Sequence, residues 1–301
     1  MPAMVQLAPG AWRSANWTIA GMVASQCAVP LQVYSERDVA PRGDARVFLP
    51  GALCLSDVLA ARGWHNVFLG GAPLSFAGKG RFLRDHAYAE TYGREEWERE
   101  GVRAEELNEW GLYDAAMFRR ARAKLAQLHA AGRPFHMSVL TLDMHNPRGF
   151  LSPECRRRGV RDFPGIVECT AAEVADFVHF ARERGYLRDT TFVIVGDHLA
   201  VPNPVYAQLR QAQERRIFGL VVADPLPQFG GRTLHAFDLY PTLLELAGFE
   251  VEGGRLGLGR TALGAGPGQD DRDPLPLASL RGSRAYRVLW EAPAGALPAS
   301  N

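Results

Sequence analysis

The chain has 301 residues, of which 47% are hydrophobic and 22% charged, and its formal net charge is +1. These values are typical of a globular protein, and one large domain is the simplest prediction. A net charge so close to zero creates no overall field that attracts nucleic acid, so nucleic-acid binding is not expected. No apolar run approaches the roughly 20 residues that cross a bilayer, and the N-terminus lacks a signal-peptide pattern. The sequence therefore predicts a soluble chain without an anchor.

Four cysteines, Cys27, Cys54, Cys155 and Cys169, show neither a C-x-x-C pair nor the Cys/His spacing of a zinc site. They form an N-terminal pair and a central pair, and the central pair flanks the polar loop "CRRRGVRDFPGIVEC". This placement suits two loop-closing disulfides in an oxidising compartment. The alternative is four reduced, buried cysteines in a cytosolic protein, because free cysteine is commonly buried.

Short apolar runs alternate with helical patterns along the chain. We expect buried strands at 67–69, 137–142, 191–195 and 217–222, and helices at 112–131, 171–184 and 238–246. This alternation predicts an α/β sandwich with a largely parallel sheet. Residues 1–263 show no clear boundary for a second domain. From Gly264 to the end, a Gly- and Pro-rich composition predicts a loose tail, in which "RAYRVLWEAP" is expected to return as a short edge element.

Two of the predicted strands end in the same kind of polar residues. Asp143 and His145 follow one strand, and Asp197 and His198 follow another. Ligands of open α/β sheets collect at the carboxyl ends of the strands, so both clusters are expected to face one crevice. Adjacent carboxylate and imidazole groups suit Zn²⁺ or Mn²⁺, and Gly196 supplies the strand break that lets both reach one ion. The alternative is a turn or capping aspartate beside a structural histidine.

The stretch "WTIAGMVASQC" begins at Trp17 and predicts a helix that starts near Thr18. Asn16 or Ser14 is expected to cap this helix. The Thr18 hydroxyl would then lie over the positive end of the helix dipole, which binds phosphate and favours a developing alkoxide. Threonine needs a metal or an adjacent base to act as a nucleophile. The alternative is an ordinary helix-start threonine.

Other catalytic motifs do not fit the sequence. In "GGAPLSFAGKG" the glycine spacing is too long for a phosphate loop, and Gly80 follows Lys79 where Ser or Thr would hold Mg²⁺. The chain has no G-x-S-x-G elbow and no H-E-x-x-H helix. A serine hydrolase or a zincin is therefore not predicted.

Taken together, several segments resemble a known family in sequence order. These are "WTIAGMVASQC", "CLSDVLAARGWHNVFLGGAPLSFAGKGRFLRDH", "WGLYD", "TLDMHNPRGFLSPEC", "VIVGDHLAVPNPV" and "FDLYPTLLELAGFEVEGGRLGLG". From about Val5 to Leu263 the chain is similar to the periplasmic catalytic domain of bacterial phosphoglycerol transferases that modify osmoregulated periplasmic glucans. That family lies in the sulfatase and alkaline phosphatase superfamily, with the lipoteichoic acid synthases. The resemblance implies a three-layer α/β sandwich with a mostly parallel central sheet.

The resemblance also implies roles for particular residues. Thr18 corresponds to the nucleophile and a metal ligand, and Asp197 and His198 correspond to the other metal ligands on this chain. His145 would bind the phosphoryl group or assist the leaving group. Lys79 matches a position where the lipoteichoic acid synthases have a substrate-binding arginine.

The implied reaction is a two-step transfer with a divalent ion, Mn²⁺ in this branch. Thr18 would attack phosphatidylglycerol, release diacylglycerol and carry glycerophosphate until a glucan hydroxyl displaces it. The family is periplasmic and tethered to the inner membrane. Together with the cysteine placement, this resemblance predicts disulfides between Cys27 and Cys54 and between Cys155 and Cys169.

The chain departs from the family pattern in one respect. In the superfamily, a first strand that ends in an acidic metal ligand precedes the nucleophile segment, but only seventeen residues precede Thr18 here and none is Asp or Glu. We expect the chain to begin after this strand and after the family's membrane anchor. The alternatives to a phosphoglycerol transferase are a phosphoethanolamine transferase, an arylsulfatase, or a truncated binding domain without catalysis. Against a sulfatase stands the missing C-x-P-x-R segment, since Cys27 is followed by Ala-Val-Pro-Leu.

Overall fold

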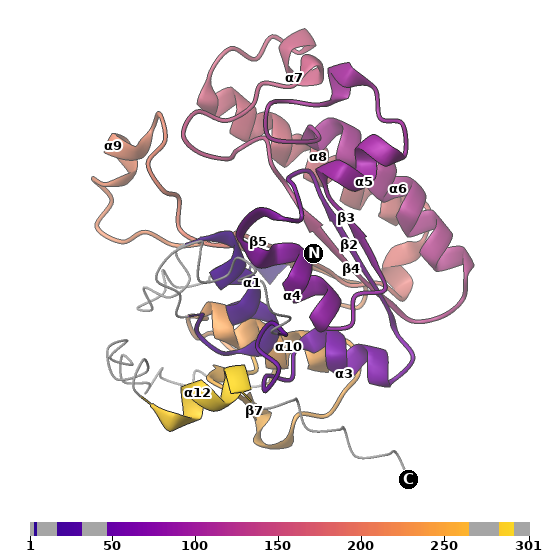
Figure 1. Cartoon of the computed structure of the whole chain (residues 1–301), viewed down its shortest axis with the longest axis vertical. Helices are drawn as coiled ribbons and strands as arrows, with labels where there is room; N and C mark the ends of the chain where they lie inside the picture. Colours follow the sequence, from indigo (N-terminus) through magenta and orange to yellow (C-terminus); the bar gives the residue numbers. More distant parts are fainter. Residues whose placement is uncertain (1–2, 5–16, 32–46, 265–282, 292–301) are drawn as a thin grey trace. The chain divides into compact units, whose positions relative to one another are not determined.

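The computed structural model describes residues 3–4, 17–31, 47–264 and 283–291. Within these ranges the chain forms two compact units, which are shown in Figure 1. The first unit takes residues 1–58, 187–199 and 213–301, and the second takes residues 59–186 and 200–212. Each unit has its own sheet.

The second unit is built on a parallel sheet with the strand order β3-β2-β4. β2 spans His65–Gly70, β3 spans Glu90–Tyr92 and β4 spans Phe135–Leu140. In the central strand β2, Val67, Phe68 and Leu69 are at most 1% exposed. Every residue of β4, in contrast, is only half-buried. This differs from the buried strand that was predicted, and among the described residues β4 pairs only with β2.

Helices cover both faces of this parallel sheet. Figure 1 shows α6 (Asp114–Ala130) and α8 (Phe163–Glu183) on one side and α4 (Lys79–Asp85) on the other. Phe118 of α6 packs against Phe177 of α8, with ring centroids 5.7 Å apart. Shorter elements complete the unit: α3 (Leu55–Ala61, which begins in the first unit), η1 (Phe76–Gly78), α5 (Arg94–Arg99), η2 (Ala104–Glu106), α7 (Pro153–Arg157), η3 (Tyr186–Arg188, which ends in the first unit) and α9 (Tyr206–Leu209).

Helix α8 begins at Phe163, well before the predicted start at Ala171. The Asp162 side chain accepts a hydrogen bond from the backbone N–H of Gly165 at 3.0 Å and so caps the helix. Pro164 lies in the first turn, where its missing N–H removes no helical hydrogen bond. The Asp-Phe-Pro-Gly run is therefore a helix start, although the sequence analysis placed it in a loop.

The first unit contains an antiparallel sheet, unlike the largely parallel sheet that was predicted. Its strand order is β1-β6-β5, with β1 at Ala3–Met4, β6 at Gly219–Val222 and β5 at Phe192–Val195. β5 is an edge strand of this sheet, and Val195 is 36% exposed. A separate two-stranded ribbon pairs β7 (Arg255–Leu256) with β8 (Gly259–Arg260), after η5 (Glu252–Gly254).

Helix α1 (Thr18–Cys27) packs in this unit against η4 (Ala236–Asp238) and α10 (Leu239–Leu246). The predicted helix at 238–246 is confirmed. Asp238 is fully buried, where its carboxylate accepts hydrogen bonds from Arg232 Nη1 and from the backbone N–H groups of His235 and Arg260, each at 2.8 Å. Because all these donors come from neighbouring segments, Asp238 holds the start of α10 to the rest of the unit.

The C-terminal segment predicted to be a short edge element is a helix, α12 (Arg284–Glu291). Tyr286, Leu289 and Trp290 recur at helical spacing, which sets this conformation. The Trp290 ring lies 5.4 Å from the Phe48 ring, and the Leu289 carbonyl accepts the Gly51 N–H. The predicted tail at 265–282 lies outside the described residues. Within the described part of the chain, no helix is both long enough and apolar enough to cross a bilayer.

Candidate active site

The carboxyl end of β5 carries an aspartate and a histidine in direct contact. The strand ends at Val195, immediately before Gly196, and Asp197 and His198 follow. The backbone N–H of His198 donates to Asp197 Oδ1 at 3.0 Å. The other carboxylate oxygen, Asp197 Oδ2, lies 3.5 Å from His198 Nε2. The Asp197 carboxylate and the His198 imidazole are therefore close enough to bind one metal ion.

A hydrogen bond fixes the tautomer of His198. Its Nδ1 lies 2.8 Å from the carbonyl oxygen of Leu199. Since a carbonyl only accepts, Nδ1 carries the proton, and Nε2 of the neutral ring keeps its lone pair. A carboxylate oxygen beside an imidazole lone pair is a ligand pair that suits Zn²⁺ or Mn²⁺. Among the residues that the structure describes, no third Cys, His, Asp or Glu joins this pair within 4.8 Å.

Helix α1 begins at Thr18, as expected from the sequence. Its N-cap is Trp17, whose extended backbone enters the helix without a side-chain cap. Asn16 and Ser14, the predicted caps, lie outside the described residues. The Thr18 side chain is half-buried at the first helical position.

A close backbone contact joins α1 to the end of β5. A Cβ atom at Gly21 would lie 2.1 Å from the carbonyl oxygen of Asp197, a distance that no side chain tolerates. Residues three apart share one face of a helix, so Thr18 lies one turn from this contact on the face that meets Asp197. The structure thus brings Thr18, Asp197 and His198 to one region of the first unit.

His145 lies in the second unit, on the loop that follows β4. Asp114, fully buried at the start of α6, accepts the backbone N–H of Leu142 at 2.6 Å and that of Asp143 at 3.0 Å. These hydrogen bonds turn the chain away from the sheet, which is why β4 ends at Leu140 and not at the predicted Leu142. The sequence analysis gave Asp114 no role, although it belongs to the motif "WGLYD".

The same motif supplies an aromatic partner for His145. The Trp110 ring stacks on the His145 ring at 5.6 Å with an interplanar angle of 19°. Gly111 makes this possible, because a Cβ atom there would lie 2.0 Å from the carbonyl oxygen of Gly71. His145 Nδ1 lies 2.8 Å from the Asn146 carbonyl, so Nδ1 carries a proton and Nε2 is left to exchange one. The motif "WGLYD" beside "DMHNP" was the sequence signal for this pair.

Asp143, which was expected to face a crevice, is buried instead. It is 1% exposed, and neither of its carboxylate oxygens has a hydrogen-bond partner among the described residues. Burial, reinforced by the nearby Asp114 carboxyl, raises the pKa of Asp143 far above its ordinary value. Its neighbour Glu173 is also buried, and burial followed by the charge of Asp114 raises the pKa of Glu173 to about 7. Burial therefore favours the protonated form of Asp143.

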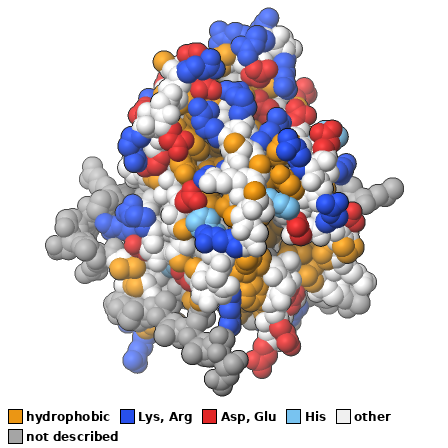
Figure 2. Space-filling view, turned by 90° about the vertical axis from the view of Figure 1, so that its right-hand side faces the viewer, with side chains coloured by type: hydrophobic (Ala, Val, Ile, Leu, Met, Phe, Trp, Pro, Cys, Tyr) orange, Lys and Arg blue, Asp and Glu red, His pale blue; other side chains and the backbone are white. Residues whose placement is uncertain are grey.

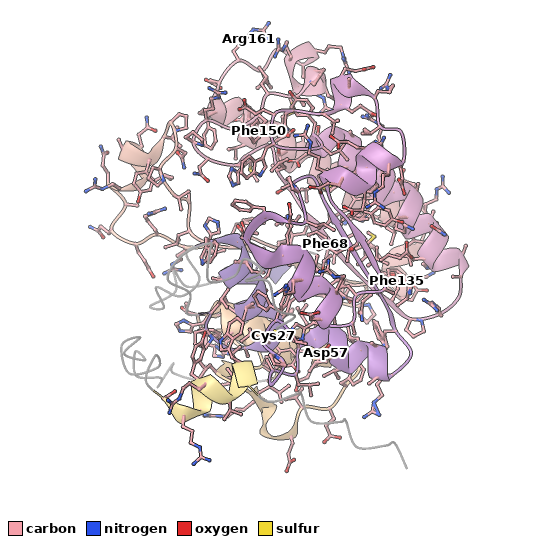
Figure 3. The ribbon with its side chains drawn as sticks, in the orientation of Figure 1. Cys27, Asp57, Phe68, Phe135, Phe150 and Arg161 are labelled. Carbon is pink, nitrogen blue, oxygen red and sulfur yellow. A yellow bond between two sulfur atoms is a disulfide. The ribbon has the colours of Figure 1, made fainter. Side chains whose placement is uncertain are left out.

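Lys79 is the first residue of α4 in the second unit and is 4% exposed. Its ammonium lies 5.9 Å from the centre of the Phe68 ring, which Figure 3 labels. Burial lowers the pKa of Lys79 to about 8, and the Glu95 carboxylate opposes this shift. At neutral pH the group is mostly a buried cation, a state that suits contact with an anion.

The cysteines lie in the two predicted pairs. Cys27, at the end of α1 and labelled in Figure 3, is joined to Cys54 in the first unit. Cys155 of α7 is joined to Cys169 of α8 in the second unit. Glu173 lies beside the second pair, but sulfurs in a disulfide are not thiolates and do not bind a metal ion.

Comparisons with known proteins show the family and the fold of the chain. The family model described as Sulfatase matches residues 49–249. The chain is 34% identical over 256 residues to "Phosphoglycerol transferase I" of Escherichia coli O127:H6, an alignment that covers 82% of the chain and 33% of that protein. The chain thus spans about a third of the length of the curated relatives it matches.

Solved structures show the same fold. A protein of the alkaline phosphatase superfamily from Vibrio parahaemolyticus aligns with a TM-score of 0.60 and 20% identity, over 81% of this chain and 58% of that one. The lipoteichoic acid synthase LtaP from Listeria monocytogenes aligns with a TM-score of 0.61 and 14% identity, over 85% and 66%. These neighbours confirm the predicted α/β fold class.

Proposed function

The chain belongs to the sulfatase family, and from this membership and the site at β5 we propose that it transfers phosphoglycerol from phosphatidylglycerol to a periplasmic glucan. The observation that supports the proposal is the close approach of Gly21 to the Asp197 carbonyl, because Thr18 lies one helical turn from Gly21. The similarity to phosphoglycerol transferase I supports phosphoglycerol as the transferred group, and the donor and acceptor follow from the family resemblance alone.

In this proposal, Asp197 and His198 hold a divalent cation, Mn²⁺ by preference, with the Thr18 hydroxyl as a third ligand. The pair fits such an ion because His198 offers a lone pair 3.5 Å from a carboxylate oxygen. A bound ion would lower the pKa of the coordinated hydroxyl and offset negative charge on the phosphoryl oxygens.

The chemistry then runs through a covalent intermediate at Thr18. In the first step, the Thr18 hydroxyl loses its proton to solvent, a bond forms between Oγ1 and the phosphorus of phosphatidylglycerol, and the bond from phosphorus to the diacylglycerol oxygen breaks. On the family resemblance, His145 Nε2 gives a proton to that departing oxygen and takes one from the attacking glucan hydroxyl in the second step. The Oγ1–phosphorus bond then breaks and the threonine is regenerated. Lys79, on the same resemblance, contacts the anionic substrate.

The test is transfer of labelled glycerophosphate from phosphatidylglycerol to glucan with Mn²⁺ present. We expect Thr18→Ala to abolish transfer and Thr18→Ser to retain part of it, because serine keeps the hydroxyl. Thr190→Ala is the matched control, since it removes an exposed hydroxyl that bonds only to Asp189 among the described residues. A phosphoryl adduct on Thr18, located by mass spectrometry, would support the intermediate. Transfer that survives Thr18→Ala would refute it.

A second candidate is a binding domain without catalysis. The observation that favours it is the missing third acidic or histidine ligand among the residues that the structure describes. Titration with Mn²⁺ separates the two, because micromolar or tighter binding speaks for an intact site. Activity towards phosphoethanolamine or aryl sulfate donors, without glycerophosphate transfer, would assign the chain to another branch of the superfamily.

We place the protein in the periplasm. The two cysteine pairs support this location, since disulfides persist in oxidising compartments. Intact mass before and after alkylation of periplasmically exported protein is the measurement. We expect no alkylated cysteine without reduction, and four alkylated thiols would contradict the proposal.

A further inference from the structure

A group of exposed arginines, which we call the α7 surface, covers one end of the second unit. It comprises Arg156, Arg157, Arg158 and Arg161, all in α7 or directly after it. Figure 2 shows Lys and Arg side chains gathered at the top of the view, at the end where Figure 1 places α7. In Figure 3, Arg161 lies at the outer edge of this end.

The charge of the α7 surface is only partly neutralised. Arg157 pairs with Glu154. Arg161 donates to two main-chain carbonyls, those of Arg156 and Val160 at 3.3 and 2.9 Å, which hold its guanidinium in place without offsetting its charge. In the described part of the chain, no carboxylate lies within 4 Å of the guanidiniums of Arg156, Arg158 or Arg161.

The segment is firmly attached to the loop that bears His145. The Ser152 hydroxyl accepts the N–H of Cys155 at 3.1 Å and caps α7, and the disulfide to Cys169 fastens α7 to α8. Just before α7, the N–H of Phe150 donates to the Asp143 carbonyl at 2.7 Å. A contact made by the α7 surface therefore fixes the position of the His145 loop as well.

Two exposed apolar side chains belong to the same region. Met144 of the His145 loop is 38% exposed, and Val167 in the early part of α8 is 37% exposed. Isolated apolar side chains are common on protein surfaces, and these two lie on segments joined to the basic α7. Cationic and apolar groups together suit the surface of an anionic bilayer, where phosphates accept from guanidiniums and apolar side chains reach the acyl boundary.

We propose that the α7 surface binds the surface of an anionic lipid bilayer. The inference takes from the proposed function only that the donor substrate is a lipid. Docking by α7 would hold the loop of His145 against the layer in which the donor headgroups lie. Arginine presents a planar fork that forms paired hydrogen bonds with phosphate, which favours phosphate-bearing headgroups as the partner.

The experiment is co-sedimentation of the full chain with phosphatidylcholine vesicles, with and without phosphatidylglycerol, at low and physiological salt. We expect binding only to the vesicles that contain phosphatidylglycerol, and weaker binding at the higher salt because screening shortens the reach of the charges. Each arginine near an anionic surface contributes roughly fivefold in affinity. The variant Arg156→Gln/Arg158→Gln/Arg161→Gln should therefore bind at least ~10-fold more weakly.

The matched control is Arg84→Gln/Arg133→Gln/Arg182→Gln, which removes the same charge from exposed positions elsewhere in the second unit. We expect this control to bind vesicles like the unaltered chain. Equal binding of vesicles by the α7 variant and the unaltered chain overturns the proposal. It is also overturned if a soluble polyanion displaces the chain completely from the vesicles, because the surface then recognises negative charge and not a bilayer. Hydrolysis of a water-soluble phosphodiester is measured in parallel and should be the same in both variants. If transfer of glycerophosphate from phosphatidylglycerol to glucan is absent while vesicle binding behaves as expected, the proposed function fails and the docking surface stands.

Discussion

The ends of β4 and β5 carry similar sequences but different chemistry. At β5, the Asp197 side chain is 34% exposed, and its Oδ2 atom lies 3.5 Å from Nε2 of His198. At β4, Asp143 is 1% exposed, and its carboxyl lies near Asp114 and Glu173 without a hydrogen-bond partner among the described residues. An aspartate after a strand is therefore a potential metal ligand in one unit and a buried acid in the other.

The comparison teaches that the local motif does not decide the role of the aspartate. What decides it is the backbone N–H groups that follow the strand. At β5 the carboxylate of Asp197 itself accepts the next N–H, that of His198. At β4 a second residue, Asp114, accepts both N–H groups and directs the Asp143 side chain inward.

The largest expected effect is on metal binding. Asp197→Ala removes one of two adjacent ligand groups. Losing a residue that only hydrogen-bonds to a metal ligand costs up to about 100-fold in affinity, so we expect the loss of a ligand itself to lower Mn²⁺ affinity at least ~100-fold. Asp143→Asn should leave Mn²⁺ affinity unchanged, because the amide has the shape of the protonated acid. Isothermal titration with Mn²⁺ measures both. A comparable loss in Asp143→Asn would remove the distinction between the two strand ends.

The next effect concerns the residue that shapes the end of β4. Asp114→Ala leaves the N–H groups of Leu142 and Asp143 buried without their acceptor, so we expect a loss of about 3 kcal/mol in the free energy of unfolding. Urea denaturation followed by circular dichroism measures the change. The control is Asp176→Ala on the exposed face of α8, for which we expect a change within about 0.5 kcal/mol. Equal effects of the two changes would show that Asp114 does not hold this loop.

A smaller effect is expected where α1 meets the end of β5. Gly21→Ala places a Cβ atom 2.1 Å from the Asp197 carbonyl oxygen, so the helix must shift, at a cost of about 2 kcal/mol in stability. We also expect weaker Mn²⁺ binding, because Thr18 moves with the helix. Gly231→Ala is the control, since no atom lies within 4 Å of its added Cβ. Unchanged stability in Gly21→Ala would argue against the close contact.

The smallest effect is on the pH dependence of stability. Burial raises the pKa of Glu173 to about 7 in the folded protein, so the folded state binds more protons than the unfolded state between the ordinary glutamate pKa and 7. Stability should therefore fall as pH rises through this window, by an amount on the order of 1 kcal/mol after allowance for solvent access. Thermal unfolding at a series of pH values measures this slope. Glu173→Gln should make this slope shallower without removing it, because the raised pKa of Asp143 contributes a slope of the same sign. Glu168→Gln, on the exposed face of the same helix, should leave the slope unchanged.

Much of the fold was predictable from the sequence because its periodic segments are long. Helices near 112–131 and 238–246 and strands near 67–69 and 191–195 were confirmed. The start of α8 was missed because a capping Asp162 followed by Pro164 resembles a loop, and α12 was missed because its apolar residues were counted as a short run.

The candidate site was predictable in part, for a physical reason. A strand followed by Asp-His indicates a ligand pair, and a small-residue helix indicates a close approach such as that of Gly21. The role of Asp114 depends on hydrogen bonds to residues far along the chain, at Leu142 and Asp143. Contacts of this kind leave no periodic signal, so neither the tether nor the burial of Asp143 followed from the sequence. The catalytic roles of Thr18, His145 and Lys79 stay predictions.

The one-sided pairing of β4 and β5 has a practical consequence for work with this protein in solution. Among the described residues, no strand pairs with the outer side of either strand, and half-buried apolar side chains lie along both. Such borders recruit strands from other molecules, so self-association should increase with protein concentration. Metal and vesicle titrations should therefore be repeated at several protein concentrations, with light scattering to measure the oligomeric state. The measured affinities can then be attributed to the monomer.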